Sequence, residues 1–228
     1  MKFIAVIISM IIYTAAFAQS QISGIYSLDR FDANLSCDLY LYENGNYFFE
    51  LSENVTDDIV EVLILSCGKF SVTKHELRLI DEVHNFELLF IVDNKSLKVK
   101  QAFSFLRNKC FIYYGNNTDD GSICSNINTL TLQEERSSYK TSHKTIIPLF
   151  YGVFESDRGF KLIIKPNNKY LLEYKSVVLS EGRWCRDGNE MELIDFDLKH
   201  PFYALINEKM LISKLLPGDY IGISLFKR

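Results

Sequence analysis

The cysteines and histidines are the residues of this chain with the broadest chemistry. Cysteine forms disulfides, binds metals or acts as a nucleophile, and a histidine beside a serine or cysteine is the usual base of a hydrolase. They are Cys37, Cys67, Cys110, Cys124 and Cys185, with His75, His84, His143 and His200. No two cysteines have the CxxC spacing of common zinc sites, and the histidines are scattered. The sequence therefore predicts no catalytic residue, no metal and no cofactor, and a hydrolase is the least favoured function.

The N-terminus predicts export. Residues 1–18 contain an early positive charge at Lys2, an apolar run from Phe3 to Tyr13 and the small-residue ending Ala16-Phe17-Ala18, which together are typical of a cleavable signal peptide. The apolar run is shorter than the roughly 20 residues of a membrane span. We expect a secreted or periplasmic protein with no membrane span after signal cleavage.

Disulfides are compatible with an oxidising compartment, and the odd number of cysteines leaves at least one thiol without an internal partner. Our preferred bridge joins Cys110 to Cys124, because these residues flank the turn-rich segment 115–121. A bridge between Cys37 and Cys67 is the next candidate.

The elements that must position these residues occur twice. Equivalent residues are 123 positions apart in the first hairpin and 114 apart from Gly68 onward, so the first copy has nine more residues, which we expect in a longer connection around Ser52 to Asp58. Such self-similarity indicates a duplicated structural unit. The matching motifs are Gly24-Ile25-Tyr26 with Gly152-Val153-Phe154, Asn44-Gly45-Asn46-Tyr47 with Asn167-Asn168-Lys169-Tyr170, Gly68-Lys69-Phe70 with Gly182-Arg183-Trp184, and Leu77-Arg78-Leu79-Ile80-Asp81 with Met191-Glu192-Leu193-Ile194-Asp195.

Alternating apolar residues and short turns predict an all-β fold. We count five or six strands per copy and expect two tandem antiparallel meanders that form small barrels or sandwiches. One closed barrel of ten or more strands built from both halves is the alternative. The expected segments are a signal peptide at 1–18, a first β repeat at 21–114, a polar linker at 115–147 and a second β repeat at 148–228.

Two shared features inside the copies have structural interpretations. Gly68 and Gly182 predict a bulge or a close backbone approach. Asp81 and Asp195 end a strand, where an aspartate usually accepts backbone hydrogen bonds in the following turn. We therefore expect these aspartates to be structural and not catalytic.

Charge and composition indicate which classes of partner the chain could bind. The net charge is −4 with no cluster of basic residues, which argues against nucleic-acid binding. Aromatic residues are 14% of the chain, and those on the predicted strands are the candidates for ligand binding. They are Tyr26, Tyr47, Phe49, Phe70, Tyr170 and Trp184.

The order of these motifs resembles the small lipocalin-like barrels of secreted and bacterial envelope proteins. The resemblance covers both repeats and implies a β-barrel that binds an apolar ligand or an envelope partner. Related envelope lipoproteins have a CxxC pair and a lipidated cysteine, and this chain has neither. The resemblance therefore does not extend to metal sensing.

Two functions are compatible with these features. The favoured one is a non-catalytic interaction module of the envelope that binds a protein or a glycan, since two similar units raise the effective concentration at a multivalent target. The alternative is a carrier of a small apolar or amphipathic ligand. The number of strands discriminates between them, because a closed barrel needs about eight strands to enclose one small ligand.

Overall fold

The structure is a computed structural model that describes residues 22–28, 35–56, 59–73, 75–117, 151–207, 210–213 and 223–228. The predicted signal peptide, most of the predicted linker, Cys124 and His143 lie outside these residues. Among the described residues, no helix has the length and apolar character needed to cross a membrane.

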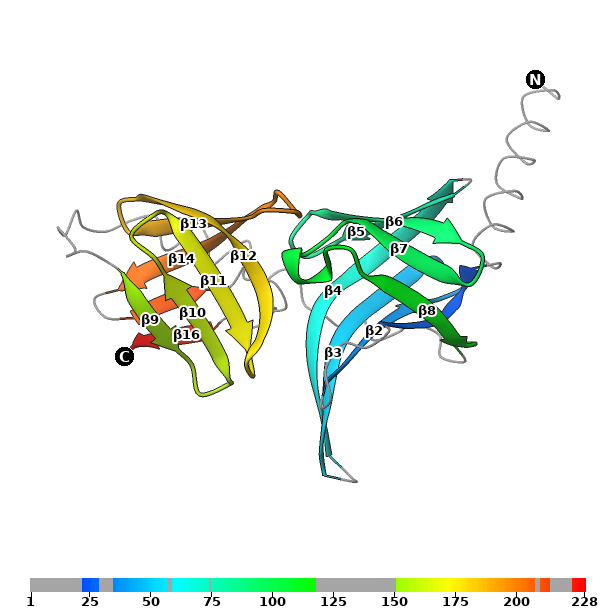
Figure 1. Cartoon of the computed structure of the whole chain (residues 1–228), viewed down its shortest axis with the longest axis horizontal. Coiled ribbons are helices and arrows are strands. Elements are labelled where there is room, and N and C mark those ends of the chain that lie inside the picture. The colour runs from blue at the N-terminus through cyan, green and yellow to red at the C-terminus, as the bar shows by residue number, and fades with distance from the viewer. Residues whose placement is uncertain are drawn as a thin grey trace, which may run out of the picture. The chain divides into compact units, whose positions relative to one another are not determined.

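The first copy folds into a closed barrel of eight antiparallel strands (Figure 1), in which each strand pairs with the next and β8 pairs back with β1. The strands are β1 (Gly24–Leu28), β2 (Leu35–Leu41), β3 (Asn46–Thr56), β4 (Ile59–Thr73), β5 (Glu76–Asp81), β6 (Glu87–Asp93), β7 (Ser96–Gln101) and β8 (Cys110–Gly115).

The second copy forms its own closed barrel, in which β9 pairs with both β10 and β16. Its strands are β9 (Gly152–Glu155), β10 (Phe160–Ile164), β11 (Lys169–Tyr174), β12 (Val177–Asp187), β13 (Glu190–Asp195), β14 (Pro201–Asn207), β15 (Met210–Ser213) and β16 (Ile223–Lys227). The prediction of two tandem all-β units is confirmed, and the single barrel built from both halves is wrong.

The expected count of five or six strands per copy is also wrong, since each copy has eight. Some strands are short, and β9 and β15 have only four residues each. Strands of that length contain too few alternations for periodicity to separate them from turns.

The two copies differ most in the hairpin made by β3 and β4. These strands have 11 and 15 residues, whereas their counterparts β11 and β12 have 6 and 11. The extra residues of the first copy are therefore mainly strand, and the long connection expected from Ser52 is wrong because β3 continues to Thr56. Figure 1 shows this hairpin extending beyond the rest of its barrel.

The chain divides into two compact units. The first contains Met1–Lys100 and Asn108–Asn126, and the second contains Gln101–Arg107 and Ile127–Arg228. The segment Gln101–Arg107, which includes the 3-10 helix η1 (Ser104–Leu106), thus packs with the second unit although it follows β7 in the chain.

Candidate functional site

Each barrel contains a buried row of tyrosine, serine and aspartate. In the first barrel, the Tyr47 hydroxyl lies 2.6 Å from the Ser66 hydroxyl, which donates to Asp81 Oδ2 at 2.7 Å. In the second barrel, Tyr170 lies 2.7 Å from Ser180, which donates to Asp195 Oδ2 at 2.6 Å. Asp81 and Asp195 are buried away from water, and buried polar groups need hydrogen-bond partners. The row provides such partners in each barrel.

A glycine holds the strands of each row close together. The register places Tyr47 opposite Gly68 and Gly68 opposite Asp81, and the second barrel repeats this with Gly182. A Cβ atom on Gly68 would lie 2.2 Å from the Ile80 carbonyl oxygen, and one on Gly182 would lie 1.9 Å from that of Ile194. The close backbone approach predicted for both glycines is confirmed.

The second oxygen of each aspartate holds the turn that follows its strand. Asp81 Oδ1 accepts hydrogen bonds from the amides of Val83 at 2.9 Å and His84 at 2.6 Å. Asp195 Oδ1 accepts from Asp197 at 2.8 Å and Leu198 at 3.0 Å. The interpretation of both aspartates as acceptors in a turn is confirmed.

One difference between the two rows is that the second unit adds Ser104. In the first barrel, the Cys67 amide donates directly to Asp81 Oδ2 at 3.4 Å. In the second unit, the equivalent amide of Glu181 donates to Ser104 Oγ at 2.8 Å. Ser104 in turn donates to Asp195 Oδ2 through its hydroxyl at 2.7 Å and its amide at 3.2 Å.

The pKa shifts in these rows have identifiable causes. Burial, together with the Asp195 charge, raises the pKa of Tyr170, so its hydroxyl stays protonated. Burial also opposes ionisation of Asp81, but the His84 ring, the His84 amide and the Ser66 hydroxyl together lower its pKa. Each row thus holds a buried carboxylate through hydroxyl donors inside a barrel.

The first barrel contains four of the six predicted ligand-binding residues: Tyr26, Tyr47, Phe49 and Phe70, all buried. Tyr26 donates its hydroxyl to the Ile22 carbonyl at 2.9 Å and has an edge contact with Tyr113, and burial with the Tyr113 charge raises its pKa to about 12. The hydroxyl of Tyr26 therefore has a partner within the protein, as that of Tyr47 does.

Side chains fill much of the interior of the first barrel. The ring of Phe111 lies 5.7 Å from that of Phe49 and 5.9 Å from that of Phe90, both in edge-to-face geometry. All three side chains are fully buried. This packing is that of a hydrophobic core.

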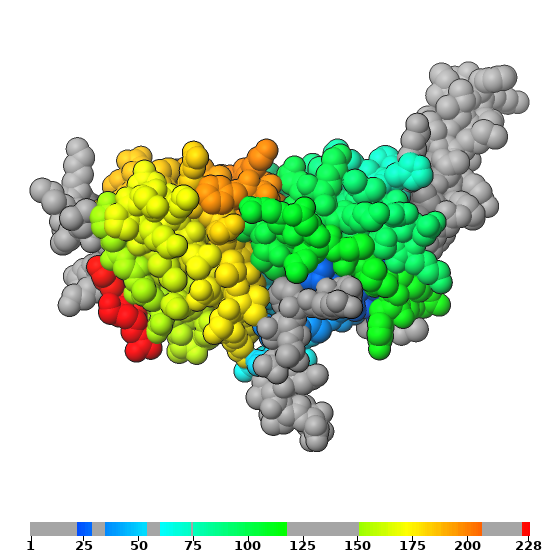
Figure 2. All heavy atoms as spheres, in the orientation of Figure 1, coloured from blue at the N-terminus to red at the C-terminus, as the bar shows by residue number. Residues whose placement is uncertain are grey.

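The second barrel contains the other two candidates, Tyr170 and Trp184. Tyr170 belongs to the buried row, whereas Trp184 is half-buried, donates its indole N–H to the Lys165 carbonyl at 3.0 Å and contacts the edge of Tyr151. Figure 2 shows a continuous surface over the face of this barrel in view. Ligand binding by the six aromatic residues stays a prediction.

The structure describes four cysteines, which form no disulfide with one another: Cys37, Cys67, Cys110 and Cys185. The candidate bridge between Cys37 and Cys67 is wrong in this fold, because β3 separates their strands β2 and β4. Two strand spacings of about 4.8 Å exceed the roughly 7 Å limit between the Cα atoms of a disulfide. Cys124 lies outside the described residues, so its pairing with Cys110 stays a prediction.

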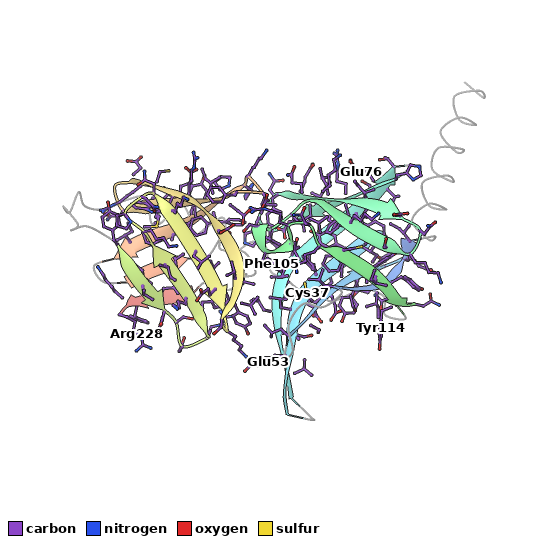
Figure 3. The ribbon with its side chains drawn as sticks, viewed as in Figure 1. Cys37, Glu53, Glu76, Phe105, Tyr114 and Arg228 are labelled. Atoms are coloured by element: carbon purple, nitrogen blue, oxygen red, sulfur yellow. The ribbon has the colours of Figure 1, made fainter. Side chains whose placement is uncertain are left out.

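One exposed feature of the first barrel is the projecting part of the β3–β4 hairpin, which Figure 3 marks at Glu53. Val60 and Val62 on β4 are 54% and 49% exposed. β4 pairs with β3 from Ile59 to Lys69 but with β5 only from Gly68 to Thr73. Within the described residues, the stretch of β4 from Ile59 to Ser66 therefore has one paired edge and one free edge.

Sequence reasoning missed Ser66, Ser180 and Ser104. The first two were detectable, because they are 114 residues apart and each precedes its repeated glycine by two positions. Ser104 belongs to none of the motifs that the two repeats share, so the comparison of the repeats could not identify it. Comparisons of the chain with family models, curated proteins and solved structures gave no match.

Proposed function

We propose that this protein is a secreted, non-catalytic interaction module of the cell envelope that contacts another protein through the projecting β3–β4 hairpin. The observation that carries the proposal is the edge of β4 that no described strand pairs with from Ile59 to Ser66, beside which Val60 and Val62 are half exposed. Soluble proteins usually shield such an edge with charges, proline or a covering element. An exposed β-branched edge is the type of surface to which a partner's extended segment binds.

The difference between the copies supports this location. The shared framework of tyrosine, serine, glycine and aspartate is present in both barrels, so it accounts for the fold and not for a role specific to one copy. The long hairpin occurs in the first copy alone. Specificity on a repeated scaffold usually lies in such an added segment.

The test is photo-crosslinking in the cells that produce the protein. A benzophenone amino acid at Val60 or Val62 is expected to give a discrete adduct, identified by mass spectrometry of its peptides. The matched control is Tyr114, an exposed aromatic residue at 81% exposure on β8 of the same barrel. Equal yields at Tyr114, or no adduct at either valine, would overturn the proposal, and an adduct removed by glycosidases would assign the surface to a glycan.

A ligand carrier is the second candidate, favoured by the eight strands of each barrel and by the resemblance to lipocalin-like proteins. The packing of Phe49, Phe90 and Phe111 argues against it in the first barrel. Native and denatured masses of the protein purified from its source separate the two functions. We expect equal masses, whereas extra mass lost on denaturation would favour the carrier.

A further inference from the structure

We propose that the second barrel binds an acidic oligosaccharide at the turn between β10 and β11. The site centres on three cationic residues, here called the basic turn, which are Lys165, Lys169 and Arg183. It lies in the other copy from the β3–β4 hairpin, so it goes beyond the proposed function. The inference follows from the charges at the turn, from the polar and aromatic side chains beside it and from its paired backbone.

The fold brings together three cations that are not contiguous in the sequence. The Lys165 amide donates to the Lys169 carbonyl at 2.9 Å, and Lys169 lies opposite Arg183 across the β11–β12 pair. All three residues are exposed, and among the described residues their side chains have no hydrogen bond and no ion pair. Like charges in direct opposition destabilise a sheet. An anion bound at this turn would relieve that repulsion.

The carboxylates nearby on the same two strands are engaged elsewhere or lie further along. Glu173, the acidic residue of β11, lies 3.3 Å from Lys161, and Glu181 on β12 lies 3.6 Å from Arg107. Asp187 is at the far end of β12. Within the part of the chain that the structure describes, the positive charge of the basic turn is therefore not neutralised by an ion pair.

The first barrel shows the same positions without excess charge. Lys69, the equivalent of Arg183, donates its ammonium group to the Asn46 side-chain oxygen. The equivalent of Asn46 is Lys169. The second barrel thus has a second cation at the position where the first barrel has an acceptor for its single cation.

The turn also presents neutral polar groups. In the first barrel, Asn44 Oδ1 accepts a hydrogen bond from the Asn46 amide at 3.0 Å. Its equivalent Asn167 and the adjacent Asn168 are exposed, and neither side chain is hydrogen-bonded among the residues described. A side-chain amide both donates and accepts hydrogen bonds. These two amides therefore suit the hydroxyl groups of a sugar.

Two aromatic side chains lie beside the turn. The Trp184 indole N–H donates to the Lys165 carbonyl at 3.0 Å, which holds the ring at the turn, and the Tyr151 ring lies 5.7 Å away in edge-to-face geometry. Both are half-buried, whereas Phe70, the first-barrel equivalent of Trp184, is buried. Aromatic rings offer a large apolar surface of fixed orientation. The C–H groups of a sugar ring can pack against that surface.

The backbone at this turn excludes the addition of a peptide strand. Each of the strands β10, β11, β12 and β13 pairs with a neighbour on both sides. The Lys165 amide and carbonyl are both bonded, and the Trp184 amide donates to the Asn168 carbonyl at 3.0 Å. A ligand must therefore bind through side chains. Cations, amides and aromatic rings together match an acidic sugar better than an extended peptide, whose affinity comes from main-chain hydrogen bonds.

The experiment uses the full mature chain and two pairs of tetrasaccharides, with binding measured by calorimetry. Tetragalacturonate has carboxylates and its methyl ester is the neutral partner, whereas sulfated maltotetraose has sulfates and maltotetraose is its neutral partner. We expect at least one acidic form to bind at least about fivefold more tightly than its neutral partner. The form that binds identifies the acid group. It should also change the fluorescence of Trp184, the only tryptophan, which locates the sugar at the turn.

A substitution taken from the first barrel tests the position. Lys169→Asn removes a cation and gives Arg183 an acceptor like that of Lys69, so it should weaken binding of the acidic sugar by about two- to fivefold. The matched control is Lys175→Asn, just beyond the other end of β11, where asparagine tolerates the left-handed backbone with its φ of 46°. The control should leave binding unchanged. Circular dichroism melting checks that both variants fold.

Several outcomes would overturn the inference. They are the absence of binding by both acidic forms, equal binding of acidic and neutral forms, and equal effects of the two substitutions. Tetraglutamate, which has carboxylates but no sugar ring, should bind more weakly than the acidic sugar; equal binding would assign the basic turn to an acidic peptide and overturn the sugar. None of these results depends on the crosslinking at Val60 and Val62, so the proposed function and this inference are tested separately.

Discussion

Ser66 and Ser180 each join a tyrosine hydroxyl to a buried carboxylate. Removing the Ser180 hydroxyl withdraws a donor from Asp195 and a partner from Tyr170. We expect Ser180→Ala to lower the free energy of unfolding by about 1–3 kcal/mol, the usual cost of an unsatisfied buried polar group. Urea denaturation followed by the fluorescence of Trp184, the only tryptophan, measures this effect in the second barrel.

Ser36→Ala is the matched control for the serine substitution. Ser36 also bonds another hydroxyl, that of Ser52 at 2.6 Å, but on the exposed surface. We expect this change to cost less than about 0.5 kcal/mol, because water replaces the lost partner. A Ser180→Ala protein as stable as the control protein would rule out a stabilising role for the buried row.

Ser104 has a more specific role, since it connects the Glu181 amide to the Asp195 carboxylate. Ser104→Ala removes a donor from the buried Asp195 carboxyl group and an acceptor from the Glu181 amide. We expect a loss of about 1–3 kcal/mol in the transition reported by Trp184. Ser96→Ala removes an exposed hydroxyl that donates to the Asp93 carbonyl, and it should leave that transition unchanged. Equal effects of the two changes would contradict the role of Ser104 as a link between Glu181 and Asp195.

At the scale of elements, Gly68 and Gly182 set the distance between β4 and β5 and between β12 and β13. An alanine at either position would place its Cβ atom within 2.2 Å of a backbone carbonyl oxygen across the sheet. We expect each substitution to destabilise the protein by about 1–3 kcal/mol or more, since backbone must move to accept the methyl group. Thermal melting by circular dichroism measures the loss.

Gly115 offers the control for the glycine substitutions. A Cβ atom there has no heavy atom within 4 Å among the described neighbours. Gly115→Ala should therefore leave the melting temperature nearly unchanged. If Gly68→Ala melted at the same temperature as Gly115→Ala, the close approach of β4 and β5 would not be the reason for a glycine at position 68.

The sequence predicted these elements well where the repeats agree and poorly where they differ. The offset between Gly68 and Gly182 identified a shared framework, because side chains that fix strand spacing tolerate few substitutions. A longer connection was expected around Ser52 to Asp58, because the change of offset locates nine extra residues there but does not show whether they form a loop or longer strands. Ser104 was out of reach because its partners are 77 and 91 residues away in the chain.

At the scale of the whole molecule, one framework serves two barrels that have changed at different places. The first barrel has lengthened β3 and β4, and the second unit has replaced a direct amide contact to its aspartate with Ser104. Both changes leave the row of tyrosine, serine and aspartate intact. Function is therefore expected in the segments that differ and stability in those that are shared.

The pH dependence of stability separates two carboxylates of the first barrel that have opposite pKa shifts. Burial raises the pKa of Glu50 above its ordinary 4.5. The hydrogen bond from Tyr40 lowers this pKa, whereas the charge of Asp38 raises it further. The pKa of Asp81 lies below its ordinary 3.8. Protonation of Glu50 thus favours the folded state as the pH falls towards 4.5, whereas protonation of Asp81 favours the unfolded state below 3.8.

Glu50→Gln tests the first of these effects. Glutamine keeps an oxygen for the Tyr40 hydroxyl, which donates to Glu50 Oε1 at 3.1 Å, and removes the buried charge. We expect the variant to be more stable than the natural protein at about pH 7, with the difference shrinking towards about pH 4.5 as Glu50 becomes protonated. Urea denaturation across this range measures the difference, with Glu43→Gln on the surface as the control. A difference that stayed constant with pH would show that the Glu50 charge does not oppose folding, because only a titrating group makes the two curves converge.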